Sequence, residues 1–420
     1  MSNLLAEHSL NEPDIQECPW AYYKAMHEKG FYFDEHLDMF VCANYALMRE
    51  ILRDPQMFSS VNSQNIAHMR TPPAEVLQIQ AQMERPVNIL VSSDPPEHGR
   101  IRGLLDGPFR RREIEKLRPA IQDVVNHTID QFITRGETDV VGDFAIPIPV
   151  AVIADILGLA RDKADDIKAW SDASVEPLGL MISDERWIEC ARIILEFQNF
   201  MTSELQARRA QPKEDLLSHL VHSIDEQGNH LSLGEMLGIT AQLLVAGNET
   251  TTNGIAAGVQ MLIENPQQQQ MLRDDPSRIL TFVNEVLRLE APVQGLYRIT
   301  TADTRLNGVS VPKGSRIMIR FAAANRDGAK YEHPDELDVC RKNAGTHVGF
   351  GAGIHHCLGA NLAREEMLQA FTLLLARVKN LRFKEGANNF SHHPNLVLRG
   401  VKVCLLVTSP SPRDHGEYLG

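Results

Sequence analysis

The sequence predicts a mainly α-helical protein with small β-sheets, an α+β fold, and three observations predict it. Apolar residues recur at helical spacing in segments separated by Pro, Gly and Asp, for example over residues 113–132, 191–209 and 276–289. Runs rich in β-branched and aromatic residues are few. No repeat or flexible linker interrupts the 420 residues, so a single domain spanning residues 1–420 is expected.

The strand-like runs are "FYFDEHLDMFVCAN" from residue 31, "GSRIMIRFAA" from residue 314 and "GVKVCLLVTS" from residue 400. One helix is expected to be very long. It begins at a capping box formed by Ser232 and Glu235, and it ends at Asn265-Pro266. Its middle carries "AGNETT", residues 246–251, where a glycine costs about 1 kcal/mol and threonine hydroxyls can bond back to the carbonyl four residues earlier. We expect the helix to bend there.

Composition and charge exclude several classes of protein. Hydrophobic residues at 43% and charged residues at 23% are typical of a folded globular chain. A formal net charge of -13 disfavours nucleic-acid binding. The N-terminus, "MSNLLAEHSLNEPDIQECPW", lacks the features of a secretory peptide, and the longest apolar run, "FAIPIPVAVIA", is far shorter than the roughly 20 residues of a membrane helix. A cytoplasmic protein without membrane contact is therefore expected.

The stretch "FGAGIHHCLGANLAREEM", residues 350–367, places a cysteine between a glycine-rich approach and a helix-forming run. A zinc ligand, a catalytic thiol with a histidine base and an iron ligand are all conceivable for Cys357. Zinc is disfavoured because adjacent residues cannot readily all point at one tetrahedral ion. The unpaired N–H groups of a helix start stabilise a thiolate, which makes a good metal ligand and equally a good nucleophile. These residues alone leave both possibilities open.

The pattern around Cys357 resembles the haem-ligand signature of the cytochrome P450 monooxygenases. Further segments resemble other parts of that family in the right order: "EVLR" with Glu285 and Arg288, "AGNETT", "VPKGS", "ANRD" and "HPDELDVCR". The resemblance covers the chain from about residue 90 to its end. It implies a triangular domain with the long helix crossing over a haem b group, and Cys357 as the ligand of the haem iron. His356 matches a variable position and has no assigned role.

The resemblance also implies roles for other residues. Glu249 and Thr250 match the acid and alcohol that deliver protons during dioxygen cleavage, although many relatives carry aspartate in place of Glu249. The residues expected to bind the haem propionates are His98, Arg102, Arg298 and His355, and the further cofactor contacts are Phe350, Gly351, Ala246 and Gly247. Glu285, Arg288 and Arg341 are expected to form a structural ion-pair group. An exposed pair at i,i+3 would contribute only about 0.2–0.5 kcal/mol.

His98 and Arg102 are i,i+4 on a helix that we expect to begin at Asp94, which would cap it. The residues expected to line the substrate pocket are Leu243, Val245, Ala246, Pro292, Val293 and Leu296. By family analogy, residues 66–90 and 174–189 form the mobile lid.

The basic stretch "RIRGLLDGPFRRREIEKLR", residues 100–118, stands out in an acidic protein. It is either a solvated helix face or a docking site for an acidic electron-transfer protein. The docking candidates are Arg110, Arg111, Arg112 and Lys116. The resemblance implies that electrons come from NAD(P)H through a ferredoxin reductase and a ferredoxin.

The sequence therefore predicts a monomeric haem-thiolate monooxygenase that uses dioxygen to hydroxylate a hydrophobic molecule, such as a terpenoid or a steroid. One alternative keeps the haem but uses peroxide in place of a redox partner. A second is a non-catalytic haem-binding or ligand-binding protein. A cysteine hydrolase is a further alternative, but it lacks an evident partner for its base.

Overall fold

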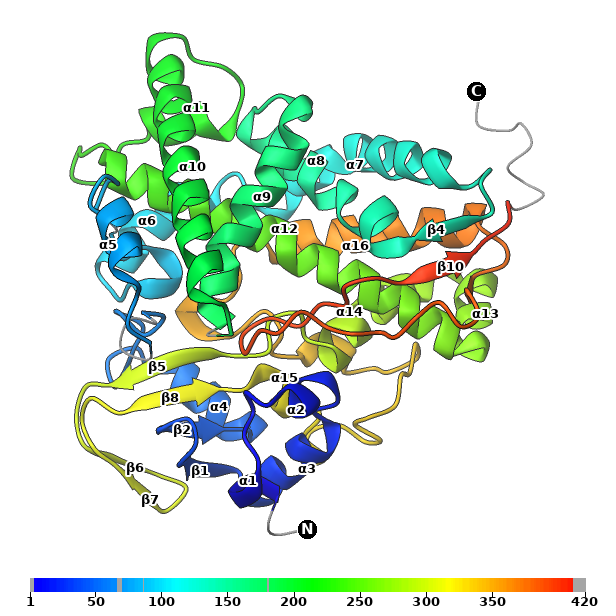
Figure 1. Ribbon diagram of the computed structural model, residues 1–420, viewed down its shortest axis with the longest axis horizontal. Helices are drawn as coiled ribbons and strands as arrows, with labels where there is room; N and C mark the ends of the chain where they lie inside the picture. Colours follow the sequence, from blue (N-terminus) through cyan, green and yellow to red (C-terminus); the bar gives the residue numbers. More distant parts are fainter. Residues whose placement is uncertain (1–3, 66–69, 86, 180, 411–420) are drawn as a thin grey trace.

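The computed structural model describes residues 4–65, 70–85, 87–179 and 181–410. Its longest described helix is α12, Leu233–Glu264, which the capping box of Ser232 and Glu235 begins as the sequence predicts. Figure 1 shows α12 running through the middle of the molecule, with most helices on one side of it and the largest sheet on the other. Nothing in the described part of the chain forms a helix that is both long and apolar enough to cross a membrane.

The other α-helices differ widely in length, and only a few are long enough to build the core. They are α1 (Leu4–Glu7), α2 (Pro13–Glu17), α3 (Trp20–Lys29), α4 (Tyr45–Arg53), α5 (Ala74–Gln80), α6 (Glu97–Asp106), α7 (Arg111–Phe132), α8 (Pro147–Leu157), α9 (Ala164–Val175), α10 (Asp184–Ala210), α11 (Leu216–His222), α13 (Pro266–Asp274), α14 (Ile279–Leu289), α15 (Phe321–Ala324) and α16 (Ala360–Arg377).

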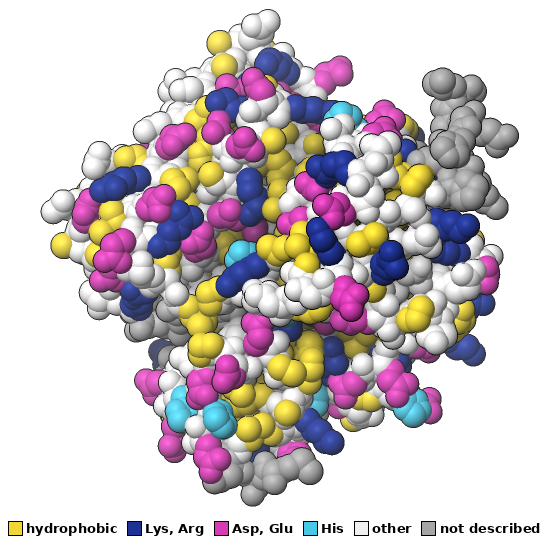
Figure 2. Space-filling model, turned by 45° about the vertical axis from the view of Figure 1, so that its right-hand side comes forward, with side chains coloured by type: hydrophobic (Ala, Val, Ile, Leu, Met, Phe, Trp, Pro, Cys, Tyr) yellow, Lys and Arg dark blue, Asp and Glu magenta, His cyan; other side chains and the backbone are white. Residues whose placement is uncertain are grey.

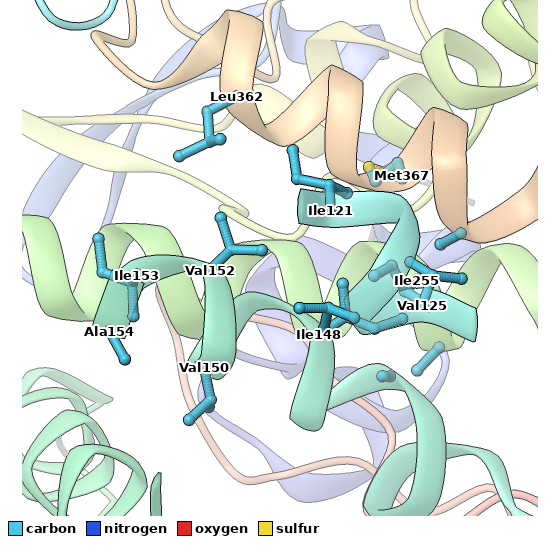
Figure 3. Packing of buried hydrophobic residues seen from close by; sticks show 14 of the residues in the cluster. Ile121, Val125, Ile148, Val150, Val152, Ile153, Ala154, Ile255, Leu362 and Met367 are labelled. Carbon is cyan, nitrogen blue, oxygen red and sulfur yellow. The ribbon is translucent and has the colours of Figure 1, made fainter. Parts of the chain in front are cut away.

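The main hydrophobic core lies where α7, α8, α12 and α16 pack together, as Figure 3 shows from close by. Side chains from all four helices meet there and are almost fully buried; examples are Ile121, Val125, Ile148, Val152, Ile255, Leu362 and Met367. Each such side chain contributes about 1.5–3 kcal/mol through its removal from water. This packing fixes α12 against α16, the helix that follows Cys357.

The strands are short and form three small sheets. They are β1 (Phe31–Asp34), β2 (Met39–Cys42), β3 (Phe58–Ser59), β4 (Glu137–Asp139), β5 (Leu296–Thr300), β6 (Thr304–Leu306), β7 (Val309–Val311), β8 (Arg316–Ile319), β9 (Arg382–Phe383) and β10 (Leu405–Val407). The largest sheet has the order β1-β2-β8-β5-β3, the second β4-β10-β9, and the third β6-β7. Pairing of Arg298 with Ile317 across β5 and β8 holds Arg298 in the interior of the largest sheet.

The helix expected to begin at Asp94 begins three residues later. α6 starts at Glu97, and the carboxylate of Asp94 accepts hydrogen bonds from Ser59 Oγ (2.5 Å) and the Ser60 amide (2.8 Å) instead. The prediction that Asp94 caps this helix is therefore wrong. The carboxylate is used to attach the segment after β3 to the start of α6, which sequence spacing alone does not indicate.

Candidate functional site

A cavity lies between α12 and the loop that carries Cys357. Its walls come from α6, α12, α16, the segment after α14, β5 and the cysteine loop. Predicted site residues that line it are His98, Arg102, Leu243, Ala246, Gly247, Thr250, Pro292, Val293, Leu296, Arg298, Phe350, Gly351, His355 and Cys357. The fold thus brings together in one cavity most of the residues that the sequence assigned to a single site.

The loop that carries Cys357 is tightly folded. The Cys357 amide donates to the Phe350 carbonyl (2.9 Å), and α16 begins three residues after the cysteine. Gly353 has φ 67°, and a Cβ there would lie 2.2 Å from the carbonyl oxygen of Leu52, so a side chain is excluded. Burial raises the pKa of the Cys357 thiol, whereas an N–H group of Gly359 and the positive charge of Arg102 oppose that rise. A cation bound at the sulfur would complete the stabilisation of a thiolate.

Arg298 is a buried cation that no carboxylate of the described residues contacts, although the charge of Asp94 acts on it from farther away. Its side chain donates through Nη1 to the Tyr297 carbonyl (2.8 Å), and no described carboxylate lies within ion-pair distance of it. The residue is 3% exposed, and burial lowers the pKa of its guanidinium to about 10. Because a buried charge needs a partner, this arrangement fits an anionic group bound in the cavity, such as a haem propionate.

Two histidines, the buried His98 and the half-buried His355, lie beside Arg298. The rings of His98 and His355 meet edge to face with centroids 4.4 Å apart, and His355 Nε2 lies 3.0 Å from Ser60 Oγ. Burial, with smaller contributions from Arg298 and His98, lowers the pKa of His355 to about 3, so its ring is neutral at pH 7. Burial also lowers the pKa of His98. Both rings therefore offer neutral N–H groups to an anion.

Arg102 is partly committed to other groups. Its Nε donates to Asp106 (2.7 Å) and its Nη1 donates to the His356 carbonyl (2.8 Å). It therefore connects α6 to the cysteine loop while it lines the cavity. Its remaining N–H groups have no partner in the described residues, and they are free to reach an anion.

The hydrogen bond on which the predicted bend of α12 depends is present. Thr250 Oγ1 donates to the Ala246 carbonyl (2.7 Å), and Thr250 faces the cavity with Ala246 and Gly247. Such back-bonding by threonine bends helices. The Thr250 hydroxyl oxygen keeps its acceptor capacity on the cavity side.

Glu249 does not line this cavity. Its carboxylate lies on the opposite side of α12, where it accepts from Ser171 Oγ (3.0 Å) and lies 3.4 Å from Lys168 Nζ. Lys168 also pairs with Asp172. Burial raises the pKa of Glu249, and the charge of Lys168 opposes that rise.

A second cavity of about 380 Å³ lies on this side of α12. Its polar lining includes Lys168, Asp172, Glu249 and Asn253. Adjacent residues of one helix thus face two different cavities, Thr250 toward the cysteine and Glu249 away from it.

The wall opposite Cys357 is mainly apolar, with one exception to the prediction. Leu243, Ala246, Val293 and Leu296 line the cavity, but Val245 does not. A helix turns about 100° per residue, so Val245 lies on the same side as Glu249, one turn earlier. Placing Val245 in the substrate pocket is therefore wrong.

Glu285, Arg288 and Arg341 form an ion-pair group outside the cavity, in which Glu285 and Arg288 are fully buried. The side chains of Glu285 and Arg288 are both 0% exposed, with Arg288 Nε 2.6 Å from Glu285 Oε1 and Arg341 Nε 3.0 Å from Glu285 Oε2. Arg288 also donates to the carbonyls of Asn325 and Glu336. The group ties α14 to the segment that follows α15.

The basic residues at the start of α7 are exposed. Arg111 pairs with Glu115 (2.9 Å) and Lys116 pairs with Glu113 (2.5 Å), whereas Arg110 and Arg112 have no ion-pair partner among the described residues. On the face seen in Figure 2, positive and negative side chains are interspersed. Arg110 and Arg112 are thus the residues of this stretch whose charges are available to a partner.

The lid predicted by family analogy is described only in part, since residues 66–69, 86 and 180 lie outside the described residues. In the described part, α5 packs on α10 through a small cluster that includes Val76, Ile79 and Trp187. Arg192 pairs with Glu75 across the same contact (2.5 Å). The two lid segments therefore contact each other in this structure.

Sequence reasoning missed several residues of the site: Ser60, Lys168, Ser171, Gln242 and Glu366. Ser60 and Lys168 come from segments distant in the sequence, so no local pattern indicates them. Gln242 could have been found, because it precedes Ala246 and Thr250 by four and eight residues and so shares their helix face.

Comparisons with known proteins agree with this geometry. The family model described as Cytochrome P450 matches residues 178–402. Cytochrome P450 107B1 of Saccharopolyspora erythraea is 33% identical over 368 residues, which cover 87% of this chain and 88% of that protein. The steroid C26-monooxygenase of Mycobacterium tuberculosis is 30% identical over 409 residues, which cover 95% of this chain and 98% of that protein.

Solved structures agree as well. The crystallographic chain of cytochrome P450 CREJ in complex with (4-ethylphenyl) dihydrogen phosphate superposes with a TM-score of 0.90 at 28% identity, covering 96% of this chain and 100% of that chain. The mainly helical architecture with small sheets is therefore shared along nearly the whole chain.

Proposed function

The chain belongs to the cytochrome P450 family of haem-thiolate monooxygenases, and we propose that it hydroxylates a hydrophobic small molecule with electrons supplied by a ferredoxin. The observation that carries the assignment of the site is that Cys357 and the Thr250–Ala246 turn of α12 line one cavity. The buried Arg298, which has no described carboxylate within ion-pair distance, lines the same cavity. Residues 1–420 form a single haem domain in this proposal, and the protein is a cytoplasmic monomer.

The residues around the cavity fit a haem group. Cys357 would bind the iron, and the group would supply dioxygen activation, since a thiolate ligand favours O–O cleavage. Arg298 would donate charge-assisted hydrogen bonds to a propionate, with neutral N–H groups of His98 and His355 beside it. The Arg364 guanidinium lies 4.5 Å from the centroid of the Phe350 ring, and this cation–π contact helps to hold the cysteine loop against α16.

Protons reach the cavity through α12. Burial raises the pKa of Glu249, which favours proton uptake by its carboxyl, and Lys168 and Asp172 connect it to the polar second cavity. Rotation of the Glu249 side chain carries a proton from the second cavity to the Thr250 hydroxyl. Thr250 then donates that proton into the cysteine-side cavity while it accepts the next one.

The pair can be tested by substitution. Glu249→Gln should reduce product formation about 100-fold, since general acids contribute about 10²–10⁴-fold, and should enlarge the solvent isotope effect. Glu249→Asp is the matched control and should keep most of the rate. Thr250→Ala should keep electron uptake but release dioxygen as hydrogen peroxide, whereas Thr250→Ser should restore product. Unchanged product yield in both Glu249→Gln and Thr250→Ala would contradict the relay.

The substrate is hydrophobic because the wall opposite Cys357 is built from Leu243, Val293 and Leu296. A relative of 30% identity is named a steroid C26-monooxygenase, which supports an alicyclic substrate of similar size.

Electrons enter from an acidic ferredoxin that receives them from NAD(P)H through its reductase. The free charges of Arg110 and Arg112 suit such a partner, because opposite charges speed weak encounters. The double change Arg110→Glu with Arg112→Glu should slow reduction by ferredoxin about tenfold at low salt and much less at high salt. Arg305→Glu, an exposed change on β6, is the control. Equal effects of both changes would contradict docking at this surface.

One experiment separates this function from the alternatives. We expect the holoprotein to convert dioxygen and two electrons from reduced ferredoxin into one equivalent of hydroxylated product from a ligand that shifts the iron to high spin. Turnover with hydrogen peroxide but never with ferredoxin and dioxygen would identify a peroxide-using enzyme. Consumption of neither would identify a non-catalytic binding protein.

A further inference from the structure

Gln242 is the amide among the polar side chains of the cysteine-side cavity, and the proposed reaction leaves it without a role. It lies about two helical turns before Thr250 on the same face of α12, which places it about 12 Å from Thr250 along the helix axis. Nearby side chains that line the cavity are apolar, including Leu90, Val91 and Leu243. Gln242 is therefore a lone hydrogen-bonding group on an apolar wall, remote from Cys357.

The orientation of this amide is fixed. Gln242 Nε2 donates to the Ile89 carbonyl (3.1 Å), and only the nitrogen end of an amide can face a carbonyl oxygen. Its Oε1 accepts no hydrogen bond from any described residue. This oxygen is not one of the solvent-inaccessible side-chain atoms that lack a partner, so a ligand can reach it. The acceptor oxygen is thus held away from Ile89 with its capacity unused.

The bond to Ile89 is not needed to hold the chain. The Ile89 carbonyl also accepts from the Ser92 amide (3.0 Å) and Ser92 Oγ (3.1 Å), so loss of Gln242 would leave it satisfied. The Ile89 side chain also packs against α12 at Gly238, where an added Cβ would lie 2.8 Å from its Cδ1. A purely structural role would therefore make Gln242 largely redundant.

We propose that Gln242 selects the substrate by accepting a hydrogen bond from a hydroxyl group at the end remote from the oxidised carbon. The substrate is then an alcohol with an apolar body about 12 Å long, which a fused alicyclic skeleton or an extended aliphatic chain supplies. This inference rests on the proposed function, because it places the oxidised carbon near Thr250 and Cys357. A site built to bond a hydroxyl discriminates strongly against analogues that lack it.

Matched ligands test the proposal. The probes are a saturated steroid alcohol, its methyl ether and the parent hydrocarbon, with a twelve-carbon alcohol series as a second scaffold. Binding to the holoprotein is measured by the spin-state shift of the iron and by calorimetry. Transfer from water to an apolar cavity favours binding of the ether and the hydrocarbon over the alcohol. Tighter binding of the alcohol would therefore indicate a hydrogen bond from its hydroxyl group. We expect the wild type to bind the alcohol about tenfold tighter than the ether.

Gln242→Leu should reduce this alcohol preference to less than about twofold and leave the affinity for the ether within about threefold. Gln260→Leu, which removes a surface glutamine of the same helix that bonds Glu264, should keep the tenfold preference. If Gln242→Leu lost affinity equally for all three ligands, the only role of Gln242 would be to hold the Ile89 segment, and the proposal would be overturned. No alcohol preference in the wild type, or no binding of either series, would also overturn it.

The carbon monoxide spectrum of each variant distinguishes a failure of the proposed role of Gln242 from a failure of the proposed haem-thiolate function. A thiolate-type spectrum with an unchanged alcohol preference refutes the role of Gln242 alone. Absence of that spectrum in the wild type refutes the haem-thiolate function on which the inference rests.

Discussion

Arg288 and Arg298 lie ten residues apart, and both are almost completely buried, yet their surroundings are opposite. Arg288 lies against Glu285 and donates to backbone carbonyls. Arg298 donates to a single carbonyl and has no described carboxylate within ion-pair distance. A buried charge with poor compensation is costly, so the fold tolerates Arg298 only if something else provides its anion. The difference separates a cation that holds the fold from one that waits for a ligand.

Glu366 shows a third way in which the cost of burying an ionisable group is reduced. It is 2% exposed and borders the cysteine-side cavity, and burial raises its pKa to about 8 against an opposing hydrogen bond from Thr251. At pH 7 this carboxyl is mostly protonated. Arg288 is thus neutralised by the protein and Glu366 by a proton, whereas Arg298 is neutralised by a bound anion in our proposal.

The largest effect is expected at Arg288. Arg288→Ala removes the closer of the two arginines that pair with Glu285 and leaves only Arg341 beside this buried carboxylate. We therefore expect a loss of about 3 kcal/mol in the free energy of unfolding, at the lower end of the cost of breaking a buried ion pair. Urea unfolding of the holoprotein measures it. Arg111→Ala, which removes an exposed pair with Glu115, is the control and should cost about 1 kcal/mol or less. A loss below about 1 kcal/mol at Arg288 would remove the contrast with Arg298.

A smaller effect of another kind is expected at Arg298. Arg298→Leu removes an uncompensated cation, so the apoprotein should be as stable as the wild type or more stable. Haem should dissociate about 10- to 100-fold faster, since hydrogen bonds to charged groups contribute about 1.5–3 kcal/mol. Transfer of haem to an excess of apomyoglobin measures the rate, and Arg298→Lys should lie between the two. Unchanged haem retention in Arg298→Leu would show that the arginine serves no bound anion.

An effect of a third kind is a slope of stability against pH. Between pH 4.5 and about 8 the folded protein keeps the proton of Glu366, whereas the unfolded chain has released it. Unfolding therefore releases a proton in this window, and Glu366 makes stability fall as pH rises, by up to about 1.4 kcal/mol per pH unit. Glu366→Gln should flatten this fall and gain most over the wild type near pH 8. Parallel stability profiles for the two proteins would show that Glu366 is ionised in the folded state.

The sequence predicted features that depend on local rules. The capping box of Ser232, the end of α12 at Asn265 and the bond from Thr250 to Ala246 all involve residues at most four positions apart. The prediction for Asp94 was wrong because a distant segment competes for its side chain: the carboxylate bonds Ser59 and Ser60 instead of capping α6. The contact of Glu249 with Lys168 on α9 could not be predicted either, since the two residues are far apart in the sequence.

Burial was equally hard to foresee. By spacing alone, Glu285 and Arg288 are an ordinary surface pair, because sequence gives their helix face but not what covers it. Val245 was misplaced because the apolar face of α12 is broad, and both sides of the helix are covered by other helices. Family resemblance supplied the grouping of His98, Arg298 and Cys357, which no local pattern could have provided.

The most direct test of the account is the absorption spectrum of the reduced protein with carbon monoxide. Cysteine-thiolate ligation by Cys357 predicts the strongly red-shifted band of thiolate-bound haem, and Cys357→Ser should lose that band while the Glu285 and Arg288 pair keeps the protein folded. A band at the position of histidine-ligated haem in the wild type, or survival of the red-shifted band in Cys357→Ser, would contradict the assignment of Cys357 as the iron ligand.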